Sequence, residues 1–279
     1  MIPATFDYVR PTTLDEALAA LAGNEDAKIL AGGHSLIPAM KLRLAQPRTV
    51  IDISRLADLN YIREKNGIIT LGAMLTHYEI ESSSFLKDRC SLLPEVAAQI
   101  GDVQVRNRGT LGGSLVHSDP AADWPAPILA LDAELEIAGP EGRRVVKASE
   151  FFVEMMQSAV QPNEILVEIR VPTTAKSVAY VKFAQKASGF AIAGVAAVTD
   201  KAGKSVRVGI TGVAAKAYRA TAVEEALQGA ALTRDAIAAA SEKAADGVET
   251  LNDIHASAEF RAHLAIVHTR RALEFAVER

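Results

Sequence analysis

Two glycine pairs in this chain lie where the backbone could bind a phosphate group. Residues 31–35 read Ala-Gly-Gly-His-Ser, and residues 110–114 read Thr-Leu-Gly-Gly-Ser. A diphosphate carries dense negative charge, and backbone N–H groups surround it only where side chains do not block the approach. Thr110 and Ser114 add hydroxyl donors to the second pair. Together the two loops predict a site that binds one diphosphate from two sides.

The loops match neither of two common nucleotide-binding motifs. The P-loop needs a lysine after its last glycine, and the dinucleotide fingerprint needs Gly-x-Gly-x-x-Gly. Both loops lack these residues, so the sequence does not support a site for NAD. A single Gly-Gly pair after a strand is more often an ordinary tight turn, and the prediction depends on the two pairs occurring together.

Other catalytic or metal-binding chemistry has little support in the residue pattern. The 6 histidines include no helical pair at metal-ligand spacing with a third ligand nearby, so no metal site is predicted. Ser35 and Ser114 lack the Gly-x-Ser-x-Gly elbow of hydrolases, and helix capping is their alternative role. Cys90 is the only cysteine, so it cannot supply the thiolates of an iron–sulfur cluster. No catalytic residue is predicted.

The composition is that of an ordinary soluble globular protein. The 279 residues are 49% hydrophobic and 23% charged, and this length favours two or three compact units. The net charge of −4, without a cluster of Lys and Arg, argues against nucleic acid as a partner. Residues 1–8 lack a secretory signal, and the longest apolar run, 190–198, is too short for a membrane span. A soluble, cytoplasmic protein is therefore expected.

A strand–turn–helix unit is expected to position the first glycine loop. An apolar strand over 27–31 leads into the glycines, and Ser35 precedes a helix that ends at Pro47. A second strand over 49–53 completes a small βαβ module. Before this module, residues 13–16 form a capping box that predicts the start of another helix.

The second loop belongs to a polar, glycine-bearing stretch, 106–114, that cannot be regular structure throughout. Helices are predicted over 92–100 and 123–131, and a last one runs from near Ser257 almost to Arg279. Strands are predicted over 68–73, 134–138, 143–146, 166–171, 179–183, 191–198 and 205–213. The change of pattern beyond Pro172 indicates a separate C-terminal α+β domain.

These residues resemble a known family. The chain is similar to the medium, FAD-binding subunit of molybdenum hydroxylases such as xanthine dehydrogenase, and in particular to carbon monoxide dehydrogenase medium subunits. The resemblance covers essentially the whole chain. It is carried by residues 29–36, 41–47, 110–114, 119–123, 182–197 and 252–255, with Phe260 and Arg261 near the end.

The resemblance implies an α+β fold with three parts. An FAD-binding domain of the PCMH type would comprise two subdomains, residues 1–55 and 56–174. A C-terminal flavoprotein domain, residues 175–279, would hold a three-stranded sheet with helices. The elements predicted from the pattern are compatible with these boundaries.

The family likeness also implies a set of FAD contacts. Backbone amides of the first loop would donate to the pyrophosphate, and the second loop would close the other side. The contacts in the first segment would be Ile29, Leu30, Ala31, Gly32, Gly33, His34, Ser35 and Leu36. Those in the second would be Thr110, Leu111, Gly112, Gly113 and Ser114.

Five further residues are implied by position. Asp123 would accept hydrogen bonds from ribose hydroxyls near the adenosine half, or else cap the helix that follows it. Leu166 would pack on the flavin and Lys182 would donate a charged hydrogen bond to it, with plain core or surface roles as alternatives. Phe190 would lie near the isoalloxazine, unless it is a buried core aromatic. Ile100 stands where many relatives have an aromatic residue, so stacking there is absent or comes from elsewhere.

The resemblance implies a subunit that passes electrons from the partner subunits to an acceptor and needs no catalytic acid–base residues. A large subunit would carry the molybdenum cofactor, a small subunit two [2Fe-2S] clusters, and the assembly would be a dimer of heterotrimers that reduces an external acceptor. One alternative is a self-contained FAD-dependent oxidoreductase acting on its own small substrate. Another is a non-catalytic module that has kept the fold and lost the flavin.

Overall fold

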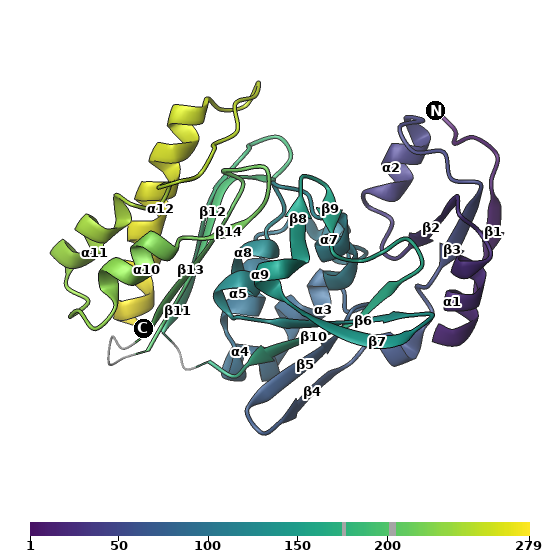
Figure 1. Cartoon of the computed structure of the whole chain (residues 1–279), viewed down its shortest axis with the longest axis horizontal. Helices are drawn as coiled ribbons and strands as arrows, with labels where there is room; N and C mark the ends of the chain where they lie inside the picture. The colour runs from purple at the N-terminus through teal and green to yellow at the C-terminus, as the bar shows by residue number, and fades with distance from the viewer. Residues whose placement is uncertain (175–176, 201–204) are drawn as a thin grey trace.

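The chain folds into three parts that lie in a row, each built around its own sheet (Figure 1). The structure is a computed structural model, and it describes residues 1–174, 177–200 and 205–279. The N-terminal part lies at one end of the row and the long C-terminal helix at the other. This arrangement confirms the predicted α+β fold class, and the segments that join the parts position the candidate site.

The first sheet is parallel and has the strand order β1-β3-β2. Its strands are β1 (Asp7–Val9), β2 (Ala27–Leu30) and β3 (Thr49–Asp52), and its helices are α1 (Leu14–Ala22) and α2 (Leu36–Lys41). The predicted βαβ module, β2-α2-β3, is confirmed. The predicted start of α1 is also correct, because the Thr13 side chain accepts a hydrogen bond from the Glu16 amide.

Helix α2 ends well before Pro47, where the sequence predicted its end. Arg43 has a φ of +59°, in the left-handed region that stops a right-handed helix. The chain therefore leaves the helix after Lys41, and Leu44, beyond the helix, is 81% exposed.

The second sheet is antiparallel and has five strands in the order β4-β5-β10-β6-β7. These strands are β4 (Ile62–Lys65), β5 (Ile68–Gly72), β6 (Glu134–Gly139), β7 (Gly142–Lys147) and β10 (Ile165–Pro172). The helical elements of this part are η1 (Ala57–Leu59), α3 (His77–Ser82), α4 (Ser84–Arg89), α5 (Leu92–Ala97), α6 (Val103–Arg106), α7 (Leu111–His117), α8 (Pro125–Ala130) and α9 (Ala148–Phe151). A small hairpin, β8 (Phe152–Glu154) with β9 (Gln157–Ser158), completes it.

The third part has an antiparallel sheet in the order β11-β12-β13-β14. Its elements are β11 (Val178–Ala184), β12 (Ala191–Thr199), β13 (Val206–Thr211), β14 (Tyr218–Arg219), α10 (Thr221–Leu227), α11 (Arg234–Ser241) and α12 (Ala258–Glu278). The short strand β14 adds a fourth strand to the three that were predicted. Helix α12 starts after Ser257, as predicted, with the Ser257 side chain as its cap.

Residues 119–123 are fixed between the second and third parts. The amides of Gly212 and Ala191 donate to the carbonyls of Pro120 (2.7 Å) and Ala121 (3.0 Å). The Thr211 hydroxyl donates to the Ala122 carbonyl (2.7 Å). The main core continues across this junction, since it includes side chains of β11 and β12 together with those of the second sheet. Three consecutive carbonyls of the segment are therefore held by the third part.

Among the described residues, no helix has the length and apolar character that a membrane span requires.

Candidate functional site

The first glycine loop leaves the carboxyl edge of the parallel sheet. Strands β2 and β3 run in the same direction, so the residues that follow them, 31–35 and 54–55, meet at one edge. The Ile53 amide donates to the Leu30 carbonyl (3.0 Å), which extends the pairing to the start of the loop. Ligands of open sheets with parallel strands bind at this edge. The predicted loop thus occupies a place that suits a ligand.

The first loop has a row of free backbone donors. Within residues 1–174, 177–200 and 205–279, no hydrogen bond uses the N–H groups of Gly32, Gly33, His34 and Ser35. Gly33 has a φ of +80°, which a glycine adopts without strain and which makes the turn between β2 and α2. Consecutive free N–H groups suit the oxygens of an anion. All four predicted pyrophosphate donors are therefore available.

Four of the five backbone amides of the second loop, those of residues 111–114, are already bonded within the chain. The amides of Leu111 and Gly112 donate to the carbonyls of Leu75 (2.9 Å) and Ala73 (2.8 Å). The Gly113 amide donates to the Thr110 hydroxyl oxygen (3.1 Å), so Thr110 caps α7. Ser114 lies inside α7, and its predicted alternative as a helix cap is wrong. Its amide is also occupied, by the Thr110 carbonyl (3.0 Å). The loop can still offer a ligand the Thr110 amide and the hydroxyls of Thr110 and Ser114.

Two of the glycines are required by contacts within the chain. A Cβ at Gly32 would overlap the carbonyl oxygen of Arg108, so the missing side chain lets the first loop touch the segment before the second. A Cβ at Gly112 would lie 2.6 Å from the Ala73 Cβ. The sequence-based explanation, that the glycines give access to a phosphate, is therefore incomplete. They also join the two loops to each other and to the second sheet.

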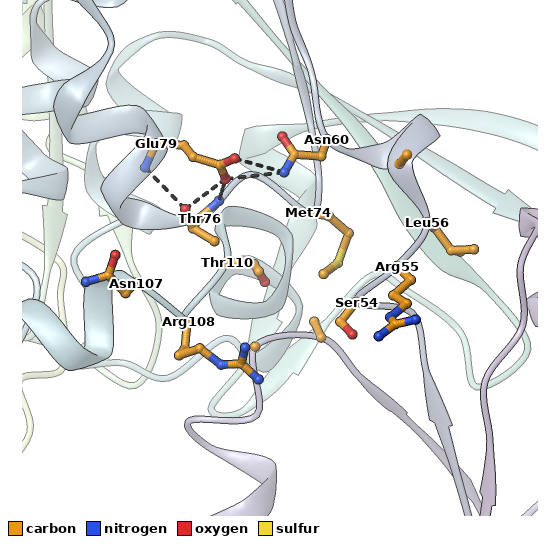
Figure 2. Close-up of a pocket in the computed structure, with 13 residues that line it drawn as sticks. Ser54, Arg55, Leu56, Asn60, Met74, Thr76, Glu79, Asn107, Arg108 and Thr110 are labelled. Atoms are coloured by element: carbon orange, nitrogen blue, oxygen red, sulfur yellow. Dashed lines mark hydrogen bonds between the residues drawn. The ribbon is translucent and has the colours of Figure 1, made fainter.

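A cavity of about 540 Å³ opens beside the two loops, between the first and second parts (Figure 2). Its walls include Gly32 from the first loop, Thr110 from the second, and Arg55 after β3. Glu79 and Asn60 lie on one side of the cavity in Figure 2, where the Asn60 amide donates to the Glu79 carboxylate (3.0 Å). Part of a dinucleotide fits a space of this size and position.

Asp123 and Lys182 form a buried ion pair. Their side chains are 5% and 3% exposed, and the Lys182 Nζ lies 2.8 Å from the Asp123 Oδ1. The Tyr180 hydroxyl donates to the same oxygen (2.6 Å), and Lys182 also donates to the Gln99 carbonyl (2.9 Å). Burial raises the pKa of Asp123, while Lys182 and Tyr180 act against that rise.

The structure bears on two predictions about Asp123. Helix α8 starts at Pro125 with Trp124 before it, so the predicted capping role of Asp123 is wrong. Asp123 and Lys182 were also assigned to the adenosine half and to the flavin, the two ends of an extended FAD. Side chains in contact cannot serve opposite ends of that molecule, so the two roles cannot both hold. Asp123 instead holds the ammonium group of Lys182 in place.

Ile100 follows Gln99, whose carbonyl binds Lys182, and Phe190 lies immediately before β12 in the β11–β12 turn. Phe190 is 49% exposed, so it is not the buried core aromatic that was the alternative prediction. A Cβ on the preceding residue, Gly189, would lie 3.5 Å from the Gly101 Cα, which brings the β11–β12 turn against the end of the 92–100 segment. Ile100 packs against the main core, and Leu166 is 3% exposed within that core on β10.

His77, which was not predicted as a site residue, packs against Gly109, immediately before the second loop. His77 is 4% exposed, and its Nδ1 accepts a hydrogen bond from the Trp124 indole (3.1 Å). Its ring proton therefore lies on Nε2, which faces Gly109: a Cβ there would lie 2.7 Å from that nitrogen. Burial, with smaller effects of the charges on His34 and Arg106, lowers the pKa of His77 to about 4.

We expect this histidine to make the protein sensitive to mild acid. Because its pKa is lower folded than unfolded (about 6.5), protons bind preferentially to the unfolded chain as the pH falls from about 6.5 to 4. The free energy of unfolding should fall by about 1.5 kcal/mol between pH 6.5 and 5 from this group alone. The His77→Gln variant keeps an acceptor for Trp124 and should show a flatter profile in urea unfolding. Identical pH profiles would contradict the assignment.

Arg55, Asn60, Glu79 and Arg108 line the cavity but were not predicted as site residues. A signal existed for two of them. Arg55 follows a strand of the βαβ module, where the sheet-edge rule places ligand contacts. Glu79 stands three residues after Thr76 in a capping box, whose hydrogen bonds the structure contains. Asn60 and Arg108 carry no comparable local pattern.

Among the residues that the structure describes, neither Cys90 nor a cluster of metal ligands contributes to this site. Burial raises the pKa of the Cys90 thiol to about 11, so Cys90 is a core side chain. In the part of the chain that the structure describes, no three His, Cys, Asp or Glu side chains gather as metal ligands.

Comparison with known protein families divides the chain into two matched regions. Residues 4–174 match the profile of the FAD binding domain in molybdopterin dehydrogenase. Residues 178–276 match the profile of the CO dehydrogenase flavoprotein C-terminal domain.

Individual relatives match over nearly the whole length. The chain is 41% identical to the carbon monoxide dehydrogenase medium chain of Hydrogenophaga pseudoflava, covering 99% of this chain and 98% of that one. It is 35% identical to the nicotine 6-hydroxylase medium subunit of Paenarthrobacter nicotinovorans, covering 95% of each. Among solved structures, H. pseudoflava carbon monoxide dehydrogenase lacking the Mo-pyranopterin moiety superposes with a TM-score of 0.95, at 42% identity, over 99% of this chain and 98% of that one. Quinoline 2-oxidoreductase from Pseudomonas putida 86 gives 0.94 at 32% identity, over 100% and 99%.

Proposed function

The chain belongs to the FAD-binding medium subunits of the molybdenum hydroxylase family, and on that premise we propose that it is the electron outlet of a multi-subunit dehydrogenase. It would take electrons from [2Fe-2S] clusters on a small partner subunit and pass them to an external acceptor. Substrate oxidation would occur at a molybdenum cofactor on a large subunit. Its single cysteine supports this division, because an iron–sulfur cluster needs several thiolates. We further propose a dimer of heterotrimers.

The observation that carries the proposal is the row of free amides in the first loop. We propose that Gly32, Gly33, His34 and Ser35 donate to the FAD pyrophosphate, and that the hydroxyls of Thr110 and Ser114 approach it from the other side. The free donors at the carboxyl edge of the sheet, together with the adjoining cavity, support this placement. Ile29 to Leu36 would line the cofactor along the first loop.

The flavin end is proposed to lie at the junction of the second and third parts. Lys182 would supply a positive charge there, and Phe190 an exposed aromatic ring beside it. Asp123 would hold Lys182 in position. Ile100 and Leu166 would contribute apolar packing from the core side. FAD, when bound, supplies the redox chemistry, and nearby charge and hydrogen bonds tune its potential.

Purification of the full chain from its native source tests this function. We expect a yellow protein that releases FAD on denaturation and copurifies with two subunits, one bearing molybdenum and one iron–sulfur clusters. A colourless chain without FAD would favour the non-catalytic module. A lone flavoenzyme that oxidises a small substrate without partners would favour the self-contained oxidoreductase.

A further inference from the structure

The cavity between the first and second parts has more positive than negative charge on its walls. The second glycine loop gives few donors to an anion, because its amides at residues 111–114 are bound within the chain. The walls, however, include two arginines, Arg55 and Arg108. The acidic side chain on the walls is Glu79, and its carboxylate is taken by the Thr76 amide (2.7 Å), the Thr76 hydroxyl (2.8 Å) and the Asn60 amide (3.0 Å).

The backbone of Arg108 is held by contacts on both sides, whereas its side chain has no bonding partner among the described residues. Its carbonyl lies against Gly32, and its amide donates to the Val105 carbonyl (3.1 Å) at the end of α6. Across the three described ranges, its guanidinium forms neither a hydrogen bond nor an ion pair. This placement holds a free cation directly beside the loop whose amides are also free.

Arg55 approaches the same cavity from the sheet edge. It follows β3, close to Asp52, whose carboxylate accepts from the Ser54 amide (2.8 Å). Asp52 also bonds the Tyr8 hydroxyl and lies 3.8 Å from the Arg10 guanidinium. That carboxylate is thus already occupied, and Arg55 has no ion-pair partner among the residues described. Figure 2 shows both guanidinium groups in the lower half of the view, away from Glu79 and Asn60.

We propose that Arg108 and Arg55 bind the FAD diphosphate, supplying the charge that the second glycine loop does not. A guanidinium matches phosphate oxygens with two parallel N–H donors and keeps its charge at any physiological pH. The free amides of Gly32–Ser35 and the two arginines would then hold the diphosphate together. The inference rests on the proposed function and adds two residues to it.

Titration of the flavin-free full chain with FAD tests the inference. At low salt we expect Arg108→Gln to raise the Kd about ten-fold and Arg55→Gln to raise it by less, because Arg108 borders the free amides. Both arginines are exposed, so the difference from the wild type should shrink as salt rises and screens the charges. Arg108→Lys keeps the charge and should bind between the wild type and Arg108→Gln.

Arg271→Gln is the matched control, because Arg271 is an exposed arginine on α12 at the far end of the molecule. Its Kd for FAD should equal that of the wild type at every salt concentration. Equal FAD affinity of all the variants at low salt would overturn the inference, and so would a loss that does not change with salt. If Arg108→Gln is unstable, Arg55→Gln and Arg108→Lys decide by the same criteria. A wild type that fails to bind FAD would instead overturn the proposed function.

Discussion

Replacing Gly32 with alanine is expected to give a chain that loses most of its FAD. The new Cβ would overlap the Arg108 carbonyl oxygen and lie 2.9 Å from the Gly109 Cα. Both obstacles are backbone atoms, so the two loops must separate. Overpacking of this kind costs about 1–3 kcal/mol, which corresponds to a roughly 5- to 150-fold weaker FAD affinity if the cost falls on the bound form. FAD content per purified chain measures the loss.

Gly23→Ala is the control for this prediction. Gly23 ends α1 with a φ of −84°, and a Cβ there would lie 3.7 Å from the Ala19 carbonyl oxygen, an ordinary contact. That variant should retain FAD as the wild type does. If Gly32→Ala also kept its full FAD content, the close approach of the two loops would not be needed for binding.

The contrast between the two loops shows what the sequence could predict about the site. The glycine pairs were enough to locate both loops, with a preceding strand as a further signal for the first. Which amides remain free depends on where the loop packs. The carbonyls of Ala73 and Leu75, which accept hydrogen bonds from amides of the second loop, lie far from that loop in the sequence. No spacing rule contains that information.

The fold was predictable where the pattern is local. Strands β2 and β3 are apolar runs bounded by turn residues, and α1 and α12 begin at capping side chains, so each was found. Strand β1 was missed because its three residues, Asp7–Val9, are all exposed and show no alternation. The early end of α2 was missed because it depends on the left-handed conformation of Arg43, a residue type that usually continues a helix.

The Asp123–Lys182 pair marks the limit of residue-by-residue inference. Each residue was selected on its own, and their roles were placed at opposite ends of the cofactor. The two are 59 positions apart in sequence and meet only because residues 119–123 pack against β12 and β13. The structure thus shows that the two residues, selected separately, form one buried unit.

Removing one member of that unit should destabilise the protein strongly. In Lys182→Met, the Asp123 carboxylate loses the one cationic partner that it has among the described residues and keeps the Tyr180 hydroxyl. Breaking a buried ion pair from one side costs about 3–5 kcal/mol, so the midpoint of thermal unfolding at pH 7 should fall by about 10 °C. Replacing both residues, as in Asp123→Asn with Lys182→Met, should recover part of the loss, because an amide can still accept from Tyr180.

The pH dependence gives this prediction a definite sign. Burial raises the pKa of Asp123, and the loss of Lys182 should raise it further. An acid whose folded pKa exceeds its unfolded pKa contributes stability at low pH that is lost as the pH rises through the folded value. The difference in unfolding free energy between Lys182→Met and the wild type should therefore narrow on acidification, and the double variant should not show this trend.

Because Lys182 is proposed to place its charge near the flavin, the Lys182→Met variant should also have a more negative FAD potential. An unchanged potential with lowered stability would leave Lys182 a purely structural role.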